Sequence, residues 1–194
     1  GFLLYDFGDG LNGLSVERWG EIPILRPSEG KLLSAASDIA IYAGAYYNGS
    51  IYASGQSNKD YLYYTLKIDP ANFSYEVLAQ VDCFVRDMAF DYTTGTMFAV
   101  LSDDRNTGAL AQMDLKTGLF TVVGDTGYEM VALACDNEGA LYAVNAAGYL
   151  YQLNKDTAEG TYRSSTSMSG SMYQSMHYDY NNDTIYWAQT SGFG

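Results

Sequence analysis

A short motif recurs along the chain at near-constant spacing: glycine, a small residue, an aliphatic residue or methionine, an aromatic residue and then alanine. It stands as GSIYA at Gly49–Ala53, GTMFA at Gly95–Ala99 and GALYA at Gly139–Ala143, and a variant, DTIYWA, follows at Asp183–Ala188. The motif starts recur after 46, 44 and 44 residues (49 to 95, 95 to 139 and 139 to 183). This period indicates a repeated structural unit built from short strands.

The second repeat divides most clearly into strands. It has runs rich in aliphatic, aromatic and threonine residues at Arg86–Tyr92, Thr96–Ser102, Ala109–Asp114 and Leu119–Asp125, each bounded by turn residues. The connections are short, which favours an antiparallel meander. Units of about 44 residues with four such strands predict an all-β fold, a β-propeller of four-stranded antiparallel blades.

The repeats divide the chain into blades of one propeller domain over residues 1–194. We expect full blades at 38–84, 85–128 and 129–170, a C-terminal half blade with strands one and two at 171–194, and an N-terminal half blade with a linker at 1–37. Tyr5-Asp6 aligns with Met113-Asp114, the end of a third strand, whereas residues 23–37 fit no repeat strand. About four blades are therefore visible.

The two half blades carry complementary strands. Pairing of Phe2–Tyr5 with Thr184–Ala188 would close a ring and remove exposed edges. The alternative is an arc of a larger propeller or an oligomer.

The motif also sets the expected side-chain register, because strand side chains alternate between faces. We expect one set of second-strand residues on one sheet face, namely Tyr52, Phe98, Tyr142 and Tyr186. Their neighbours should point to the other face, namely Ile51, Met97, Leu141 and Ile185. Both sets should be largely buried in interior blades, since blades pack on both faces.

Charge and hydropathy restrict the partners. The formal net charge is −13, with 10 basic and 23 acidic residues. Such a surface repels nucleic-acid phosphates and anionic lipid, so we expect no nucleic-acid partner. No stretch approaches the length of apolar residues that a membrane span needs, so no membrane insertion is expected.

Reactive residues are few and scattered. His177 is the only histidine and lies on an expected first strand, where a packed structural role is favoured. Cys83 and Cys135 lie in different repeats and read as core residues, although a disulfide between them stays open. Neither a phosphate-binding glycine loop nor a nucleophile motif occurs. We therefore expect no catalytic residue, no metal site and no cofactor.

The remaining candidates lie in loops. In a propeller, the connections between strands two and three and between successive blades gather on one face. Here these loops are Ser54–Asp60, Leu101–Gly108, Gly124–Glu129 and Asn145–Gly148. Their polar and aromatic residues are candidates for binding a sugar, a cation or a basic peptide: Asn58, Asp103, Asp104, Asn106, Tyr128 and Glu129. The adjacent acids Asp103 and Asp104 read as solvated, with a calcium contact as the alternative.

Two segments carry a resemblance to known proteins. MAFDYTTGTMFAV and LAQMDLKTGLFTVVGDTG resemble β-propeller repeats of the WD40-like and YVTN-like superfamily. QSMHYDYNNDTIYWAQ is similar to propeller segments of large secreted or surface proteins of anaerobic gut bacteria. The resemblance implies an extracellular or cell-surface location, and it carries no catalytic residue onto this chain.

Three functions remain open. The leading hypothesis is a non-catalytic ligand-binding or adhesion module of an exported bacterial protein, with a carbohydrate or protein ligand. The alternatives are a propeller-based hydrolase or lyase acting on polysaccharide, and a structural spacer or oligomerising domain. An enzyme should bring several ionisable groups with shifted pKa values into one pocket.

Overall fold

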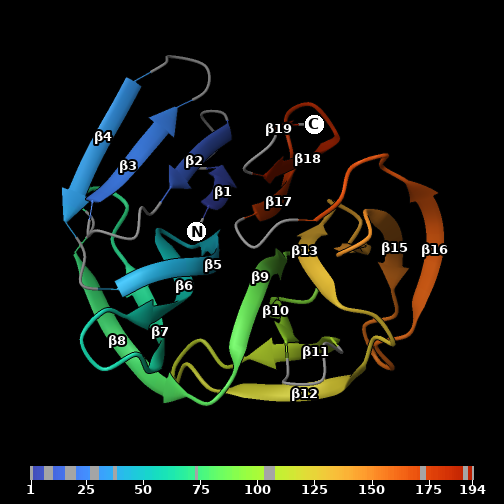
Figure 1. Cartoon of the computed structure of the whole chain (residues 1–194), viewed down its shortest axis with the longest axis horizontal. Helices are drawn as coiled ribbons and strands as arrows, with labels where there is room; N and C mark the ends of the chain where they lie inside the picture. The colour runs from blue at the N-terminus through green and yellow to red at the C-terminus, as the bar shows by residue number, and fades with distance from the viewer. Residues whose placement is uncertain are drawn as a thin grey trace.

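The structure is a computed structural model in which all described elements are strands (Figure 1). It describes residues 2–6, 11–15, 21–26, 31–36, 39–72, 74–102, 108–170, 174–189 and 192–193, with the backbone alone before residue 39 and after residue 188. Within these ranges there is no helix, and hence none long and apolar enough to span a membrane.

The strands form five antiparallel sheets in chain order. The first contains β1 (Phe2–Asp6), β2 (Leu11–Ser15), β3 (Glu21–Arg26) and β4 (Lys31–Ala36). The second contains β5 (Ile39–Tyr47), β6 (Ser50–Ser57), β7 (Tyr63–Ile68) and β8 (Tyr75–Val81). The third contains β9 (Phe84–Asp91), β10 (Thr96–Ser102), β11 (Gly108–Met113) and β12 (Phe120–Asp125).

The last two sheets follow the same pattern. The fourth contains β13 (Met130–Cys135), β14 (Leu141–Asn145), β15 (Tyr149–Leu153) and β16 (Gly160–Ser165). The fifth has three strands, β17 (Gln174–Asp179), β18 (Thr184–Gln189) and β19 (Gly192–Phe193). Each sheet is a meander, and the sheets surround a common axis with their first strands innermost (Figure 1). The all-β propeller predicted from the repeats is confirmed.

The N-terminal segment differs from the expected half blade and linker. β1 to β4 form a complete four-stranded sheet, and residues 23–37, which the repeats did not place, supply part of β3 and all of β4. The cause is an ambiguous pattern: an apolar residue followed by Asp stands at the end of first strands, as in Phe90-Asp91, and of third strands, as in Met113-Asp114. Tyr5-Asp6 therefore matches Phe90-Asp91 at the end of β9 as well as it matches a third strand.

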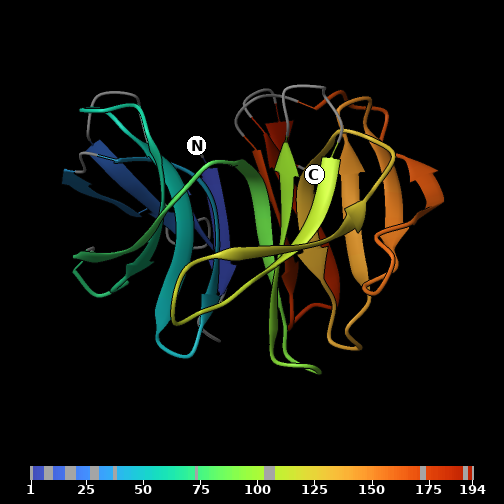
Figure 2. The ribbon, with the colours of Figure 1, turned by 90° about the horizontal axis from the view of Figure 1, so that it is seen from below.

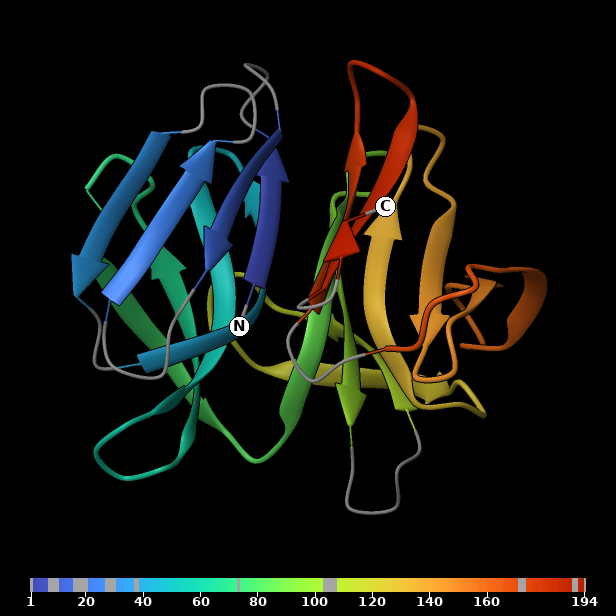
Figure 3. The ribbon, with the colours of Figure 1, turned by 45° about the horizontal axis from the view of Figure 1, so that its top comes forward.

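The ring does not close by pairing the chain ends. β1 pairs with β2, while β18 pairs with β17 and β19, so the predicted ladder between Phe2–Tyr5 and Thr184–Ala188 is wrong. Instead, β1 packs beside both β5 and β17, and Figure 3 shows the first and fifth sheets side by side. Closure thus uses contact between two neighbouring sheets rather than one sheet shared by both ends.

The core lies between successive sheets, which explains why both faces of the central sheets are apolar. Phe98 and Leu110 of the third sheet pack with Leu133 and Leu141 of the fourth. The expected register is confirmed, since Tyr52, Phe98, Tyr142 and Tyr186 each lie opposite the matching residue of the first strand. Of these aromatic residues, Tyr52 and Phe98 are buried, whereas Tyr142 and Tyr186 are half-buried.

Candidate functional site

The meander gives the molecule two loop-bearing faces. One face carries the connections between second and third strands and those between successive sheets; we call it the loop face. The other carries the tight turns between first and second strands, for example Tyr92–Gly95; we call it the hairpin face. Figure 2 views the sheets edge-on, with connections above and below them. Of the predicted ligand-binding residues, Asp103, Asp104 and Asn106 lie outside the described residues.

Glu129 on the loop face is held by an arginine of the third sheet. Its Oε1 lies 2.6 Å from Nη2 of Arg86, and the two side chains are 27% and 16% exposed. The same Nη2 donates to the hydroxyl of Ser102 at 3.4 Å, and the guanidinium lies 4.8 Å from the ring centroid of Phe84. Glu129 therefore joins the β12–β13 connection to β9, and its carboxylate is already neutralised.

Tyr128, next in the chain, keeps an exposed ring. Its side chain is 46% exposed, and the ring stacks on Tyr151 with centroids 4.7 Å apart and planes 28° apart. Asn58 is also exposed, but it lies in the β6–β7 connection of the second sheet. The structure thus brings Tyr128 and Glu129 together, as their sequence positions require, and leaves Asn58 in a separate sheet.

Three tyrosines that sequence reasoning did not select are linked to Tyr128 through a series of ring contacts that begins at Tyr151. Tyr151 contacts Tyr162 across the β15–β16 ladder, with centroids 6.0 Å apart, and Tyr162 contacts Tyr149 at 6.0 Å. Tyr151 is buried, whereas Tyr149 and Tyr162 are 43% and 55% exposed. We call Tyr128, Tyr149, Tyr151 and Tyr162 the tyrosine platform. Alternation in the segment YLYQL, followed by a tyrosine in the next strand, was the available signal.

A buried carboxylate stands at the axis of the ring. Asp87 on β9 is fully buried. Its Oδ2 accepts from the backbone N–H of Leu133 at 2.9 Å and of Met176 at 2.8 Å. Its Oδ1 accepts from the N–H of Met88 at 3.0 Å and from the Ser175 hydroxyl at 3.1 Å. One carboxylate therefore connects the first strands of three sheets.

The donors around Asp87 are related by the repeat. Met88, Leu133 and Met176 each lie opposite the residue that follows the motif's aromatic in the second strand. Asp87 itself occupies the position filled by Ala132 and Ser175 in the next two sheets. Burial raises the pKa of Asp87 to about 8, and the hydrogen bonds to its oxygens oppose that rise.

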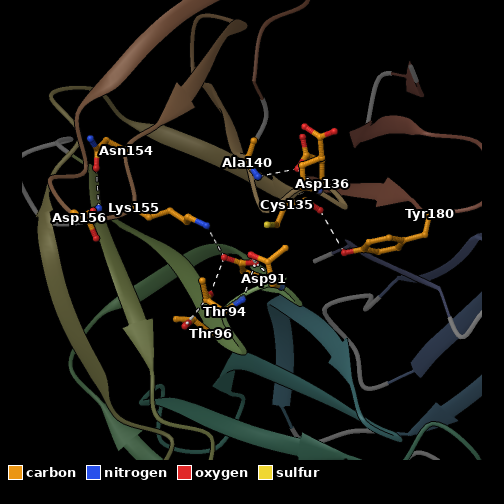
Figure 4. A network of polar contacts seen from close by, with 12 residues as sticks. Asp91, Thr94, Thr96, Cys135, Asp136, Ala140, Asn154, Lys155, Asp156 and Tyr180 are labelled. Carbon is orange, nitrogen blue, oxygen red and sulfur yellow. Dashed lines mark hydrogen bonds and ion pairs between the residues drawn. The ribbon is translucent and has the colours of Figure 1, made fainter.

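On the hairpin face, a second buried aspartate connects two sheets (Figure 4). The Asp91 side chain has no exposed surface; it accepts from Nζ of Lys155 at 2.6 Å and from the hydroxyls of Thr93 at 2.6 Å and Thr94 at 2.7 Å. Burial opposes ionisation, but these hydrogen bonds outweigh it and hold the pKa of Asp91 well below its usual range. Nearby, the Tyr180 hydroxyl donates to the Cys135 carbonyl.

The remaining candidates are the two cysteines and the histidine, and each is at least half-buried. Cys83 and Cys135 are free thiols, and burial raises their pKa values to about 11 and about 12. His177 is half-buried on β17 and lies near the Tyr180 ring. Among the described residues, no group of three or more His, Cys, Asp or Glu side chains is arranged to hold a metal ion.

The fold is identified by comparison with solved structures, because the sequence comparisons find no relative. No protein family profile and no curated protein sequence matches the chain significantly. The structure resembles the PQQ-bound aldose sugar dehydrogenase of Streptomyces coelicolor, with a TM-score of 0.61 and 12% identity over 95% of this chain and 72% of that one. It also resembles a chain of the nidogen/laminin complex, with a TM-score of 0.66 and 13% identity over 92% and 70%.

A third similar structure is the gluconolactonase XC5397 of Xanthomonas campestris. Its TM-score is 0.63 at 10% identity, and the match covers 91% of this chain and 64% of that one. These neighbours are β-propellers, so this chain is a β-propeller protein. At such low identity the likeness concerns the fold alone, because enzymes and a binding protein share it.

Proposed function

We propose that the chain is a non-catalytic ligand-binding module that works through its loop face, as part of an exported bacterial protein. One observation carries this proposal: at the β12–β13 connection the carboxylate of Glu129 is neutralised by Arg86, while the neighbouring Tyr128 ring stays 46% exposed. A fixed aromatic ring beside a neutralised ion pair offers contact area rather than a reactive group.

The arrangement of ionisable groups favours binding over catalysis. A catalytic acid or base must reach its substrate and exchange a proton with it. Asp87 has a strongly raised pKa, yet it is fully buried and its oxygens accept hydrogen bonds from four donors. Asp91 is likewise buried and paired. Both acids therefore stabilise the ring of sheets.

The same features argue against a purely structural spacer. A spacer gains nothing from leaving Tyr128, Tyr149 and Tyr162 half exposed, because exposed aromatic clusters favour association. The resemblance of the C-terminal repeat supports an extracellular or cell-surface location. Asp103 and Asp104 stay predicted as solvated side chains, with a calcium contact as the alternative.

The test combines binding with turnover. The purified chain is presented to immobilised neutral and anionic glycans and to acidic and basic peptides, and is incubated with polysaccharides, lactones and esters. We expect the chain to bind at least one of these ligand classes saturably and to turn over none of the polysaccharides, lactones or esters. Tyr128→Ala should weaken binding. Tyr92→Ala is the control and should not weaken it, because Tyr92 is 51% exposed but lies on the hairpin face.

Each contrary result has a distinct meaning. Turnover would contradict the non-catalytic assignment and favour the polysaccharide hydrolase or lyase. Binding that Tyr92→Ala abolishes and Tyr128→Ala leaves unchanged would move the site to the hairpin face. Absence of binding to every class would favour the spacer. Thermal unfolding of both variants shows whether either substitution disturbs the fold.

A further inference from the structure

The tyrosine platform lies where the third and fourth sheets meet. Tyr151 belongs to the core between these sheets, together with Phe98 and Leu110 of the third sheet. Tyr128 lies in the connection between the two sheets. Tyr149 on β15 and Tyr162 on β16 lie on the same sheet face, farther from the core. The buried Tyr151 thus anchors an exposed aromatic surface.

Ring contacts hold this surface in place before any ligand arrives. Tyr128 stacks on Tyr151, while Tyr162 meets both Tyr149 and Tyr151 nearly edge-on, with interplanar angles of 72° and 78°. Side chains that are already ordered lose little conformational entropy on binding. The perpendicular arrangement presents ring faces and edges at neighbouring positions, and the phenol hydroxyls add hydrogen-bonding groups.

The size of the platform suits a small cyclic ligand. Neighbouring ring centroids are separated by 4.7 to 6.0 Å, the distance of direct ring contact, so the rings form one continuous surface only a few side chains wide. A pyranose has an apolar face of axial C–H groups that packs on an aromatic face, and a rim of hydroxyls that bonds to polar groups. One or two stacked sugar units would therefore cover the exposed rings.

Charge selects among the ligands that stack on tyrosine. The chain's charge of −13 disfavours nucleotides and acidic glycans. A basic peptide would need a free carboxylate beside the rings, but Glu129, the carboxylate next to Tyr128, is paired with Arg86. Arg163, next to Tyr162, bonds the side chain of Gln152, which lies on the sheet face opposite Tyr151 because strand side chains alternate. Of these charges, one carboxylate is paired and the guanidinium is directed to the other face, which favours a neutral ligand on the platform.

We propose that the tyrosine platform of Tyr128, Tyr149, Tyr151 and Tyr162 binds neutral saccharides by stacking. This inference rests on the proposed binding function and assigns its ligand class. The site lies on the rim between two sheets, away from the axis, where the buried Asp87 accepts the inward-facing donors of three sheets. Tyr149 and Tyr162 are thus binding residues beyond the loops named from the sequence.

The experiment uses cellohexaose, xylohexaose, mannohexaose and chitohexaose as probes, with titration calorimetry of the whole chain. We expect at least one to bind, and Tyr162→Ala and Tyr149→Ala to weaken that binding by about tenfold or more, as loss of an anchoring ring does at other interfaces. Tyr75→Ala is the matched control, because Tyr75 is 41% exposed on β8, the outermost strand of another sheet. It should bind like the unchanged chain.

The outcomes separate the platform from the wider binding function. If a saccharide binds and both platform variants bind it equally well, the platform is wrong while the binding function stands. If none of the four saccharides binds but oligolysine does, the ligand class is wrong and the binding function again stands. If neither binds, the saccharide proposal is overturned, and the peptide and glycan panel then decides the binding function.

Discussion

Replacement of Asp87 tests the hydrogen-bonded centre of the ring most directly. In Asp87→Ala the buried N–H groups of Leu133 and Met176 lose their acceptor. Each buried unsatisfied group costs about 1–3 kcal/mol, so the two together predict a loss of roughly 2–6 kcal/mol in the free energy of unfolding. A domain of this size has only about 5–15 kcal/mol to lose, so the variant should be markedly unstable.

Asp87→Asn should be much milder, because asparagine matches the protonated acid. Its carbonyl oxygen still accepts from Leu133 and Met176, and its amide group donates to the Ser175 hydroxyl, which turns from donor to acceptor. Only the hydrogen bond from the adjacent Met88 N–H is lost. We expect a cost of about 1 kcal/mol or less at acidic pH.

The pH dependence gives the sharper comparison. The pKa of Asp87 is about 8 in the folded chain and 3.8 as the ordinary reference value, so the folded state holds the proton more tightly. Its stabilisation is complete below about pH 4 and is lost as pH rises toward about 8, at no more than about 1.4 kcal/mol per pH unit. Asp87→Asn lacks this proton, so its stability relative to that of the unchanged chain should rise with pH.

Urea unfolding followed by tryptophan fluorescence, from about pH 5 to about pH 8, measures both effects. The difference between the unchanged chain and Asp87→Asn should change by up to about 4 kcal/mol over this range. Asp125→Asn, in an exposed position, is the control. A difference that stays flat would show that Asp87 is ionised throughout, and a cost below about 1 kcal/mol for Asp87→Ala would show that the N–H groups find other acceptors.

Three further predictions concern the packing between sheets. Phe98→Ala should cost about 3–5 kcal/mol in urea unfolding, since Phe98 is 2% exposed, and a loss below about 1 kcal/mol would contradict the assigned register. Lys155→Met should cost about 1–3 kcal/mol near neutral pH and shift acid unfolding of the chain to higher pH, because the lowered pKa of Asp91 stabilises the fold above its ordinary value and this contribution is lost as pH falls. An unchanged acid midpoint would count against the ion pair. Gly118→Ala should lower the melting temperature more than Gly49→Ala, because both glycines have positive φ but only at Gly118 would the new Cβ meet side chains of the neighbouring sheet; equal losses would refute that contact.

The repeat predicted the fold because strand and turn chemistry are local. The expected strand Thr96–Ser102 coincides with β10, and its neighbours agree within about two residues at either end. The prediction failed at the N-terminus, where the glycine–aromatic motif is missing and Tyr5-Asp6 fits two strand positions. Local patterns therefore identified the repeated blades and not the divergent one.

The site was predicted less completely, because its contacts join distant segments. Asp87 and Ser175 are 88 residues apart, and nothing in the isolated segment RDMAFDY shows that its first aspartate faces the axis while its second ends a strand. Tyr128 was selected from its loop, yet Tyr149 and Tyr162 were missed because tyrosine is common in strands of this chain. Their role depends on the meeting of two sheets, which no single repeat encodes.

The hydrogen-bonded axis at Asp87 and the tyrosine platform at the rim are related through a property of the propeller fold. The first strand of each sheet pairs on one side only, so N–H groups on its other edge face the axis and need acceptors. One aspartate, placed where neighbouring sheets have alanine or serine, accepts from three of them. Because Asp87 accepts from these donors, the three backbone N–H groups of β9, β13 and β17 are not left for a ligand. Under the proposed binding function, recognition therefore depends on side chains at the rim, and between the third and fourth sheets Tyr128 stacks there on the core residue Tyr151.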